Sequence, residues 1–206
     1  MEITVKRNER LRVYDNTDGT KTVTITKVES KLKDLNPGEV FRIGDNDFIV
    51  LEQDVENGVT CVISKWLMAE NVRFGNNNDY CNSNLKTVME TDILPIIERE
   101  VGAENICVHT VSLRSVDMQH GTRTLRCRIR PITFDEARKY NNLLVSEELD
   151  DWWWTCTPWS TEERGWGRSI TVVSPSGYII DGYFGSVSGV RPFCILNSNI
   201  FVSKGE

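Results

Sequence analysis

Apolar and polar residues alternate in two runs at the start of the chain, over residues 2–14 and 21–29. Alternation with a period of two is typical of strands that expose one face. Between the runs, Asp18-Gly19 supplies a turn that can adopt positive φ. The pattern therefore predicts an N-terminal β-hairpin.

Three short apolar runs follow the hairpin, and each is bounded by a polar turn that contains glycine, asparagine or aspartate. The runs are 40–43, 48–51 and 60–63, and the turns between them are 44–47 and 57–58. Runs of this length with turn residues between them indicate strands joined in sequence. We therefore expect a three-stranded meander.

Helix signals appear in the middle of the chain. Ser83 or Asn84 can cap a helix that begins after a polar loop. Thr91 offers a second cap before residues 92–101, and Gly102 is a typical residue to end that helix. The spacing predicts two short helices with a bend between them.

A further helix is expected after two strands. Residues 105–113 and 124–130 have the pattern of strands, and Thr133-Phe134-Asp135-Glu136 matches the capping box, in which the first and fourth residues cap each other's backbone. This signal predicts a helix that runs to about Leu144.

The part from Asp150 onward is rich in tryptophan, glycine and turn residues. Short strands are expected near 170–173, 178–181 and 193–196. Strands, then helices, then strands again indicate an α+β fold with mixed antiparallel sheets, short helices and a loop-rich C-terminal part. We assign residues 1–30 to a β-hairpin extension and residues 31–206 to the α+β domain.

Charge narrows the choice of partners. The chain has 206 residues and a formal net charge of -6, which opposes attraction to phosphate backbones, so non-specific nucleic-acid binding is not expected. Four arginines alternate with apolar residues or stand close to them, and this pattern predicts one solvated strand face. They are Arg123, Arg126, Arg128 and Arg130.

The start of the chain has no apolar run of signal-peptide length, and no stretch approaches the ~20 apolar residues of a membrane span. No membrane association is expected, and we expect a cytoplasmic protein. Wide spacing and mostly apolar flanks predict free, buried and chemically inert thiols for the six cysteines. These are Cys61, Cys81, Cys107, Cys127, Cys156 and Cys194.

The candidate catalytic chemistry is sparse. Only His109 and His120 could activate a thiol, and on a strand His109 stands about 7 Å from Cys107 on the same face, beyond hydrogen-bond reach. Two histidines and scattered cysteines provide little for a zinc site, and the loop at 76–79 lacks the ligand spacing of a calcium site. We therefore predict no catalytic residues, no metal and no cofactor.

The unusual feature of the chain is aromatic. Trp152-Trp153-Trp154 must alternate faces on a strand, so at least one ring is expected in the core while a neighbour tends to the surface. The later aromatic residues and arginines either fill a loop-rich core or contact a partner, because such side chains dominate interface hot spots. The candidate binding residues are Trp159, Arg164, Trp166, Arg168, Tyr178, Tyr183 and Phe184.

Four separated motifs occur in the order found in a family of domains of unknown function that is common in gut bacteria and their phages. They are GEVFRIG at 38–44, SNLK at 83–86, WWWTCTP at 152–158 and GVRPF at 189–193. The chain resembles this family over about residues 31–203. The family is similar to proteins with the C-type-lectin-like fold, which formylglycine-generating enzymes and the variable proteins of diversity-generating retroelements also use.

The resemblance implies that a W-W segment and a G-V-R strand frame an irregular, partner-binding stretch, here residues 155–188. It also implies that Arg191 belongs to the framework. We expect Arg191 to pair with a carboxylate or with loop carbonyls near the tryptophans.

The function that follows is a non-enzymatic protein-binding module, in one version a phage or mobile-element inhibitor of a host defence protein, of the anti-CRISPR kind. The alternatives are an enzyme of the formylglycine-generating type and a module that binds a small ligand or glycan on its tryptophans. The close cysteine pair of those enzymes and the sugar-binding motifs of calcium lectins are not present in the sequence.

Overall fold

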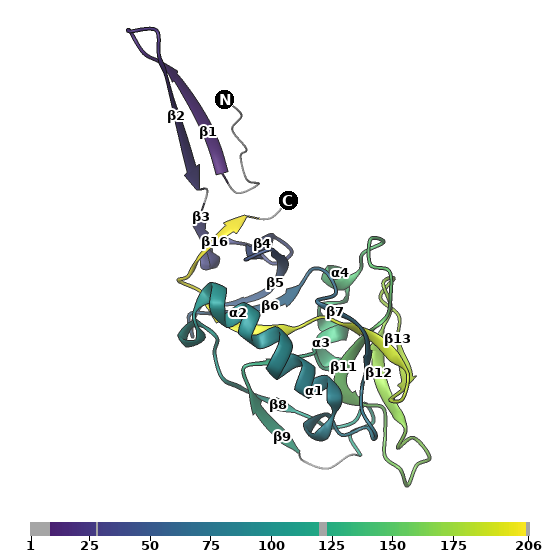
Figure 1. Cartoon of the computed structure of the whole chain (residues 1–206). Helices are drawn as coiled ribbons and strands as arrows, with labels where there is room; N and C mark the ends of the chain where they lie inside the picture. The colour runs from purple at the N-terminus through teal and green to yellow at the C-terminus, as the bar shows by residue number, and fades with distance from the viewer. Residues whose placement is uncertain (1–8, 28, 120–122, 205–206) are drawn as a thin grey trace.

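Strands and short helices are interspersed along the chain in the computed structural model shown in Figure 1. The structure describes residues 9–27, 29–119 and 123–204. The described strands form four sheets, of seven, five, two and two strands. Most neighbouring strands run antiparallel, and the α+β class predicted from the sequence is confirmed.

The N-terminal hairpin consists of β1 (Glu9–Asp15) and β2 (Lys21–Lys27), which pair antiparallel along their full length. Gly19 in the turn has a φ of 82°, the left-handed conformation that favours glycine. The expected hairpin is confirmed over these residues, and the expected strand residues 2–8 and 28 lie outside the described part.

Among the described strands, β1 and β2 pair only with each other, and Figure 1 shows them projecting away from the rest of the molecule. The next strand, β3 (Glu29–Lys31), belongs instead to the seven-stranded sheet, where it pairs with β16 (Phe201–Lys204). The main body of the fold therefore begins at β3.

The seven-stranded sheet contains the expected meander, because β4, β5 and β6 are consecutive neighbours in it. In spatial order the strands before β16 and β3 are β10 (Ile129–Arg130), β15 (Phe193–Asn197), β6 (Val59–Ser64), β5 (Asn46–Asp54) and β4 (Val40–Ile43).

The five-stranded sheet carries the tryptophan segment as its central strand. In spatial order its strands are β13 (Ile179–Tyr183), β12 (Ser169–Val173), β11 (Trp153–Pro158), β14 (Val187–Val190) and β7 (Ala69–Arg73). β11 and β14 run parallel, with Trp153 opposite Gly189. A side chain at Gly189 would meet the Leu67 side chain at 2.6 Å, so Leu67 would have to shift to admit it.

A long helical segment crosses the front of the body in Figure 1 and consists of α1 (Asn84–Val88), the π-helical η3 (Met89–Ile93) and α2 (Leu94–Val101). Its start is as predicted, because the Ser83 hydroxyl accepts a hydrogen bond from the Lys86 N–H. The end at Gly102, with a φ of 83°, is also as predicted.

The expected cap at Thr91 is wrong. The Thr91 hydroxyl donates to the carbonyl of Thr87 at 2.9 Å, so it bonds back into the preceding turn and caps nothing. Pro95, which has no N–H, follows the widened π-helical turn of η3. The two expected short helices are present as α1 and α2, and the π-helical turn η3 joins them where a second cap was expected.

The capping box is confirmed: Thr133 and Glu136 cap each other's backbone at the start of α3 (Phe134–Lys139). The helix breaks at Tyr140 and continues as α4 (Asn141–Leu144), which ends where the sequence predicts.

The expected strands at 105–113 and 124–130 are shorter in the structure. β8 (His109–Ser112) and β9 (Thr124–Cys127) form a two-stranded sheet. The remaining short elements are 3-10 helices: η1 (Leu32–Asp34), η2 (Tyr80–Asn82) and η4 (Ala103–Asn105).

Two apolar clusters lie on opposite faces of β11. Trp154 packs with residues of the long helical segment, and its indole N–H donates to the Val72 carbonyl at 2.7 Å. Trp153 packs with residues of α3 and α4. Because both faces of this strand are covered, both rings are buried, while Trp152 is partly buried.

Arg191 is buried at 1% exposure against the ring of Trp153. Its Nε donates to the Ser64 carbonyl at 2.9 Å and its Nη1 to the Leu144 carbonyl at 3.1 Å. The guanidinium carbon lies 4.7 Å from the centre of the Trp153 ring, and burial lowers the pKa of Arg191 to about 9. The expected pairing with carbonyls near the tryptophans is confirmed.

Candidate functional site

The predicted binding residues fall into three places around strands β11, β12 and β13. Trp159, Arg164 and Trp166 belong to the loop between β11 and β12, which we call the 159–168 loop. Arg168, Tyr183 and Phe184 lie where β12 begins and β13 ends, and Tyr178 lies before the start of β13.

The 159–168 loop is held by its own backbone. The Trp159 N–H donates to the Ser169 carbonyl at 3.0 Å, and the Trp166 N–H donates to the Thr161 carbonyl at 3.0 Å. Gly165 adopts a φ of 81°, which permits the tight turn that carries Arg164 outward. The aromatic side chains therefore stand on a fixed backbone.

Trp159, Arg164 and Trp166 are brought together around a surface depression of about 420 Å³, which we call the smaller depression. Trp166 is 45% exposed, Arg164 is exposed and Trp159 is partly buried. These three predicted residues therefore share one surface.

Tyr183 and Phe184 stack on each other, with ring centres 4.9 Å apart. Tyr183 is 50% exposed, whereas Phe184 packs against the larger apolar cluster. The Phe184 N–H donates to the Arg168 carbonyl at 3.0 Å, which fixes the end of the β12–β13 hairpin. Phe184 thus supports the ring of Tyr183 from below.

Tyr178 is 70% exposed but lies at the other end of β13 from Tyr183. Its backbone carbonyl accepts a hydrogen bond from the Ser174 N–H, which closes the turn between β12 and β13. The structure therefore does not bring Tyr178 together with the other candidates.

A segment that the sequence does not single out completes the smaller depression. The Val116 N–H donates to the Pro158 carbonyl at 3.1 Å, and the Ser160 hydroxyl donates to the Asp117 carboxylate at 2.5 Å. Hydrogen bonds from Ser160 and Ser115 lower the pKa of Asp117. Nothing in the sequence pattern around residues 115–118 predicts that this segment crosses the end of β11.

On the other side of Val116 lies a larger depression of about 580 Å³. It is bounded by β8, by the segment that follows it, by α3 and by the end of β11. Its lining residues are Thr110, Val111, Ser112, Arg114, Ser115, Val116, Met118, Arg130, Thr133, Phe134, Asp135, Glu136, Arg138 and Thr157.

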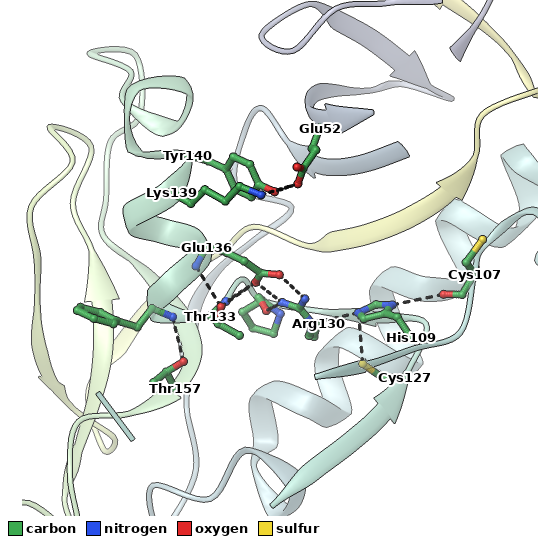
Figure 2. A network of polar contacts seen from close by, with 12 residues as sticks. Glu52, Cys107, His109, Cys127, Arg130, Thr133, Glu136, Lys139, Tyr140 and Thr157 are labelled. Atoms are coloured by element: carbon green, nitrogen blue, oxygen red, sulfur yellow. Dashed lines mark hydrogen bonds and ion pairs between the residues drawn. The ribbon is translucent and has the colours of Figure 1, made fainter. Parts of the chain in front are cut away.

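The buried pair of Arg130 and Glu136, shown in Figure 2, contributes to this lining. Two parallel hydrogen bonds of 2.6 Å join the guanidinium to the carboxylate. Burial acts to raise the pKa of Glu136, but the hydrogen bonds and charge of Arg130 outweigh it, so the pKa is lowered. The carboxylate is also fixed by the Thr133 N–H at 2.7 Å.

The expectation that Arg130 lies on a solvated face is wrong, because its side chain is 3% exposed. Arg123 and Arg128 are partly exposed and hold Asp79 and Glu98. Alternation predicts which face of a strand a residue lies on. It does not predict that α3, which carries Glu136, covers the face on which Arg130 lies.

His109 connects the pair to the cysteines, as Figure 2 shows. The Arg130 Nε–H donates to His109 Nε2 at 3.0 Å, so Nε2 carries no proton and Nδ1 faces the Cys107 carbonyl at 3.4 Å. Burial and then the charge of Arg130 lower the pKa of His109 to about 4. The imidazole is therefore neutral near pH 7.

The structure places Cys127, and not Cys107, with its sulfur beside the His109 ring. The distance from Cys127 Sγ to His109 Nε2 is 3.8 Å, across the β8–β9 pair. Burial raises the pKa of Cys127 to about 11. A protonated thiol beside an imidazole whose lone pair is already bonded to Arg130 is not an activated nucleophile.

A second cluster in Figure 2 ties the helices to the seven-stranded sheet. Glu52 on β5 accepts hydrogen bonds from the Tyr140 hydroxyl and, at 2.7 Å, from Lys139. The Thr157 hydroxyl accepts from the Phe134 N–H at 3.0 Å. These bonds fix α3 against β5 and β11, so they position the wall of the larger depression.

All six cysteines are free thiols, of which Cys127, Cys156 and Cys194 are buried and the other three are partly buried. Burial raises the pKa of Cys156 to about 12. Within residues 9–27, 29–119 and 123–204, no three histidine, cysteine or acidic side chains are grouped as a metal site would require.

No protein-family model, no curated protein and no solved structure gives a significant match to this chain. Among the described helices, none has the length and apolar character needed to cross a membrane.

Proposed function

We propose that this chain is a non-enzymatic module that binds another protein through the surface formed by the 159–168 loop and the end of the β12–β13 hairpin. One observation carries the proposal: Trp166 and Tyr183 are half exposed, while the strands that position them are anchored in the core. Large aromatic side chains on a rigid scaffold are typical of interface anchors.

The chemistry of the best candidate catalytic pair supports a binding role. His109 is neutral and already accepts a hydrogen bond from Arg130, and the Cys127 thiol is protonated near neutral pH. An enzyme of the formylglycine-generating type would need thiolates ready for copper. The sequence lacks the close cysteine pair of those enzymes, which disfavours that alternative.

We further propose the C-type-lectin-like fold and membership of the gut-bacterial and phage family for residues 31–203. The adjacency of β11 and β14 supports this, because the two framing motifs then lie side by side with the 155–188 stretch between them. We propose that the module is an inhibitor of a host defence protein and acts in the cytoplasm. Its six free thiols support the cytoplasm, because thiols stay reduced there.

The test is affinity capture from a lysate of the source organism with tagged wild-type protein and the Trp166→Ala and Tyr183→Ala variants, followed by mass spectrometry. A protein captured by the wild type should be lost or strongly reduced with both variants while their melting temperatures stay close to that of the wild type. Equal capture by all three proteins would contradict the proposed surface. Arg99→Gln, on the exposed side of α2, serves as the control variant.

A further inference from the structure

Three arginines near the proposed surface are unpaired within the described part of the chain or form only long, exposed ion pairs. Arg114 forms no ion pair with any residue that the structure describes. Arg138 lies 3.4 Å from Asp135 with both side chains more than half exposed, and Arg164 lies 3.9 Å from Asp117. Exposed pairs at these distances contribute little to stability.

Other arginines in the same chain are paired more closely. Arg42 holds Asp47 at 3.1 Å and Arg123 holds Asp79 at 2.8 Å. In a chain with 30 acidic residues and 24 basic ones, carboxylates are abundant. The guanidinium groups of Arg114, Arg138 and Arg164 are therefore held less closely by carboxylates than those of Arg42 and Arg123.

All three arginines line the two depressions already described. Arg114 and Arg138 line the larger one and Arg164 lines the smaller one. Val116 lines both, so the two depressions lie next to each other near the end of β11, and we call them together the groove.

The groove also has apolar walls. Phe134 and Met118 line the larger depression and Trp166 lines the smaller one. Met118 is 57% exposed and adopts a φ of 61°, held by a hydrogen bond from its N–H to the Ser115 carbonyl at 2.9 Å. A left-handed backbone at a residue other than glycine is strained, and strain of this kind concentrates at binding sites.

The carboxylates of the groove do not neutralise these arginines closely. Glu136 is held by two hydrogen bonds from Arg130, and Asp117 accepts from Ser160 and Ser115. Asp135 forms an ion pair with Arg138 at 3.4 Å, and its side chain is 78% exposed.

We infer that this groove receives an extended, acidic segment of the partner protein, whose carboxylates pair with Arg114, Arg138 and Arg164 while an apolar side chain packs against Trp166 or Met118. Arginine suits this role because its planar fork binds a carboxylate through two parallel hydrogen bonds. The inference rests on the proposed function and adds the chemistry of the partner.

A protein segment is favoured over a nucleic acid as the occupant. The net charge of -6 repels a long polyanion more strongly than a short segment with a few carboxylates. Apolar and basic groups along one groove also match a mixed peptide better than a continuous phosphate backbone.

The experiment pans a random dodecapeptide library against the full-length protein and measures the best peptide by fluorescence anisotropy. Enriched peptides should contain Asp or Glu beside an aromatic or aliphatic residue. The double variant Arg114→Gln/Arg138→Gln should weaken binding by about tenfold or more. Arg99→Gln should leave binding unchanged, and added salt should weaken it.

Each other outcome overturns the inference. Peptides without acidic enrichment, no enriched peptide at all, or equal affinity for the double variant would exclude an acidic segment. Tighter binding of an oligouridylate than of the best peptide would assign the groove to a nucleic acid. A melting measurement on the double variant and on the milder Arg114→Lys variant separates lost contacts from lost structure.

The two proposals fail separately. If the acidic preference is absent but Trp166→Ala still abolishes capture from lysate, the groove inference is wrong and the protein-binding surface stands. If Trp166→Ala captures as the wild type does, the proposed function itself is wrong.

Discussion

Strand β11 and the 159–168 loop that follows it are both rich in tryptophan, yet their aromatic rings are placed differently. Trp153 and Trp154 are at most 1% exposed, whereas Trp166 is 45% exposed. The strand is covered on both faces, and the loop is held by backbone bonds that leave its side chains outside. Composition therefore does not distinguish a buried ring from an exposed one, but the surrounding contacts do.

The largest expected effect is at Trp154. Trp154→Ala removes a fully buried ring and the hydrogen bond to the Val72 carbonyl, so it should lower the free energy of unfolding by about 3–5 kcal/mol. Urea denaturation measures this change. A loss below about 1 kcal/mol would contradict the placement of this ring in the core.

The second prediction concerns Arg191. Arg191→Ala leaves the Ser64 and Leu144 carbonyls without their donor and opens a cavity beside Trp153, so it should cost about 2–3 kcal/mol. Arg191→Met keeps most of the volume and removes a buried charge, and it should cost less. Unchanged melting of the alanine variant, with loss of captured protein, would make Arg191 a contact residue.

The third prediction is a dependence of stability on pH. The folded-state pKa of His109 is about 4, below its unfolded value near 6.5, so protonation favours the unfolded state. The stabilisation is fully present above about pH 6.5 and is lost as the pH falls toward 4, to a total on the order of 2 kcal/mol after solvent screening is allowed for.

Urea midpoints between pH 7 and pH 5 test this. In that range Glu136 stays ionised in both the folded and the unfolded protein, because its folded-state pKa is lowered, so it adds little to the change of stability with pH. His109→Gln keeps an acceptor for Arg130 and cannot be protonated in this range. Its midpoint should vary less with pH than that of the wild type, and an equal slope for both proteins would refute the assignment.

The smallest expected effect on stability is at Trp166. Because the ring is about half exposed and the loop is fixed by its backbone, Trp166→Ala should change the free energy of unfolding by no more than about 1 kcal/mol. A loss as large as that expected for Trp154→Ala would show that the loop ring is part of the core, and the comparison would fail.

Local signals in the sequence account for much of the fold. The turn at Gly19, the cap at Ser83 and the capping box at Thr133 and Glu136 each depend on residues close together in the chain, and the structure contains all three. Thr91 has the same cap chemistry but lies inside a helix, because its hydroxyl can also bond to Thr87 one turn earlier.

Contacts between distant segments could not be predicted in this way. Arg130 is buried because α3 folds over it, and Cys127 meets His109 because β8 and β9 pair. The groove depends on the hydrogen bond from the Val116 N–H to the Pro158 carbonyl. These residues are 42 positions apart, and a periodic pattern in the sequence does not predict their contact. The candidate aromatic residues could be identified from composition. That Tyr178 lies apart from the other candidates could be seen only from the arrangement of β13 in the sheet.

Hydroxyl-radical footprinting of the free protein and of the captured complex tests the central claim most directly. In the free protein, Trp166, Tyr183 and Tyr178 should be oxidised rapidly and Trp153 and Trp154 should not. In the complex, Trp166 and Tyr183 should be protected while Tyr178, at the other end of β13, stays reactive. Protection of Tyr178 with Trp166 still reactive would contradict the proposed binding surface.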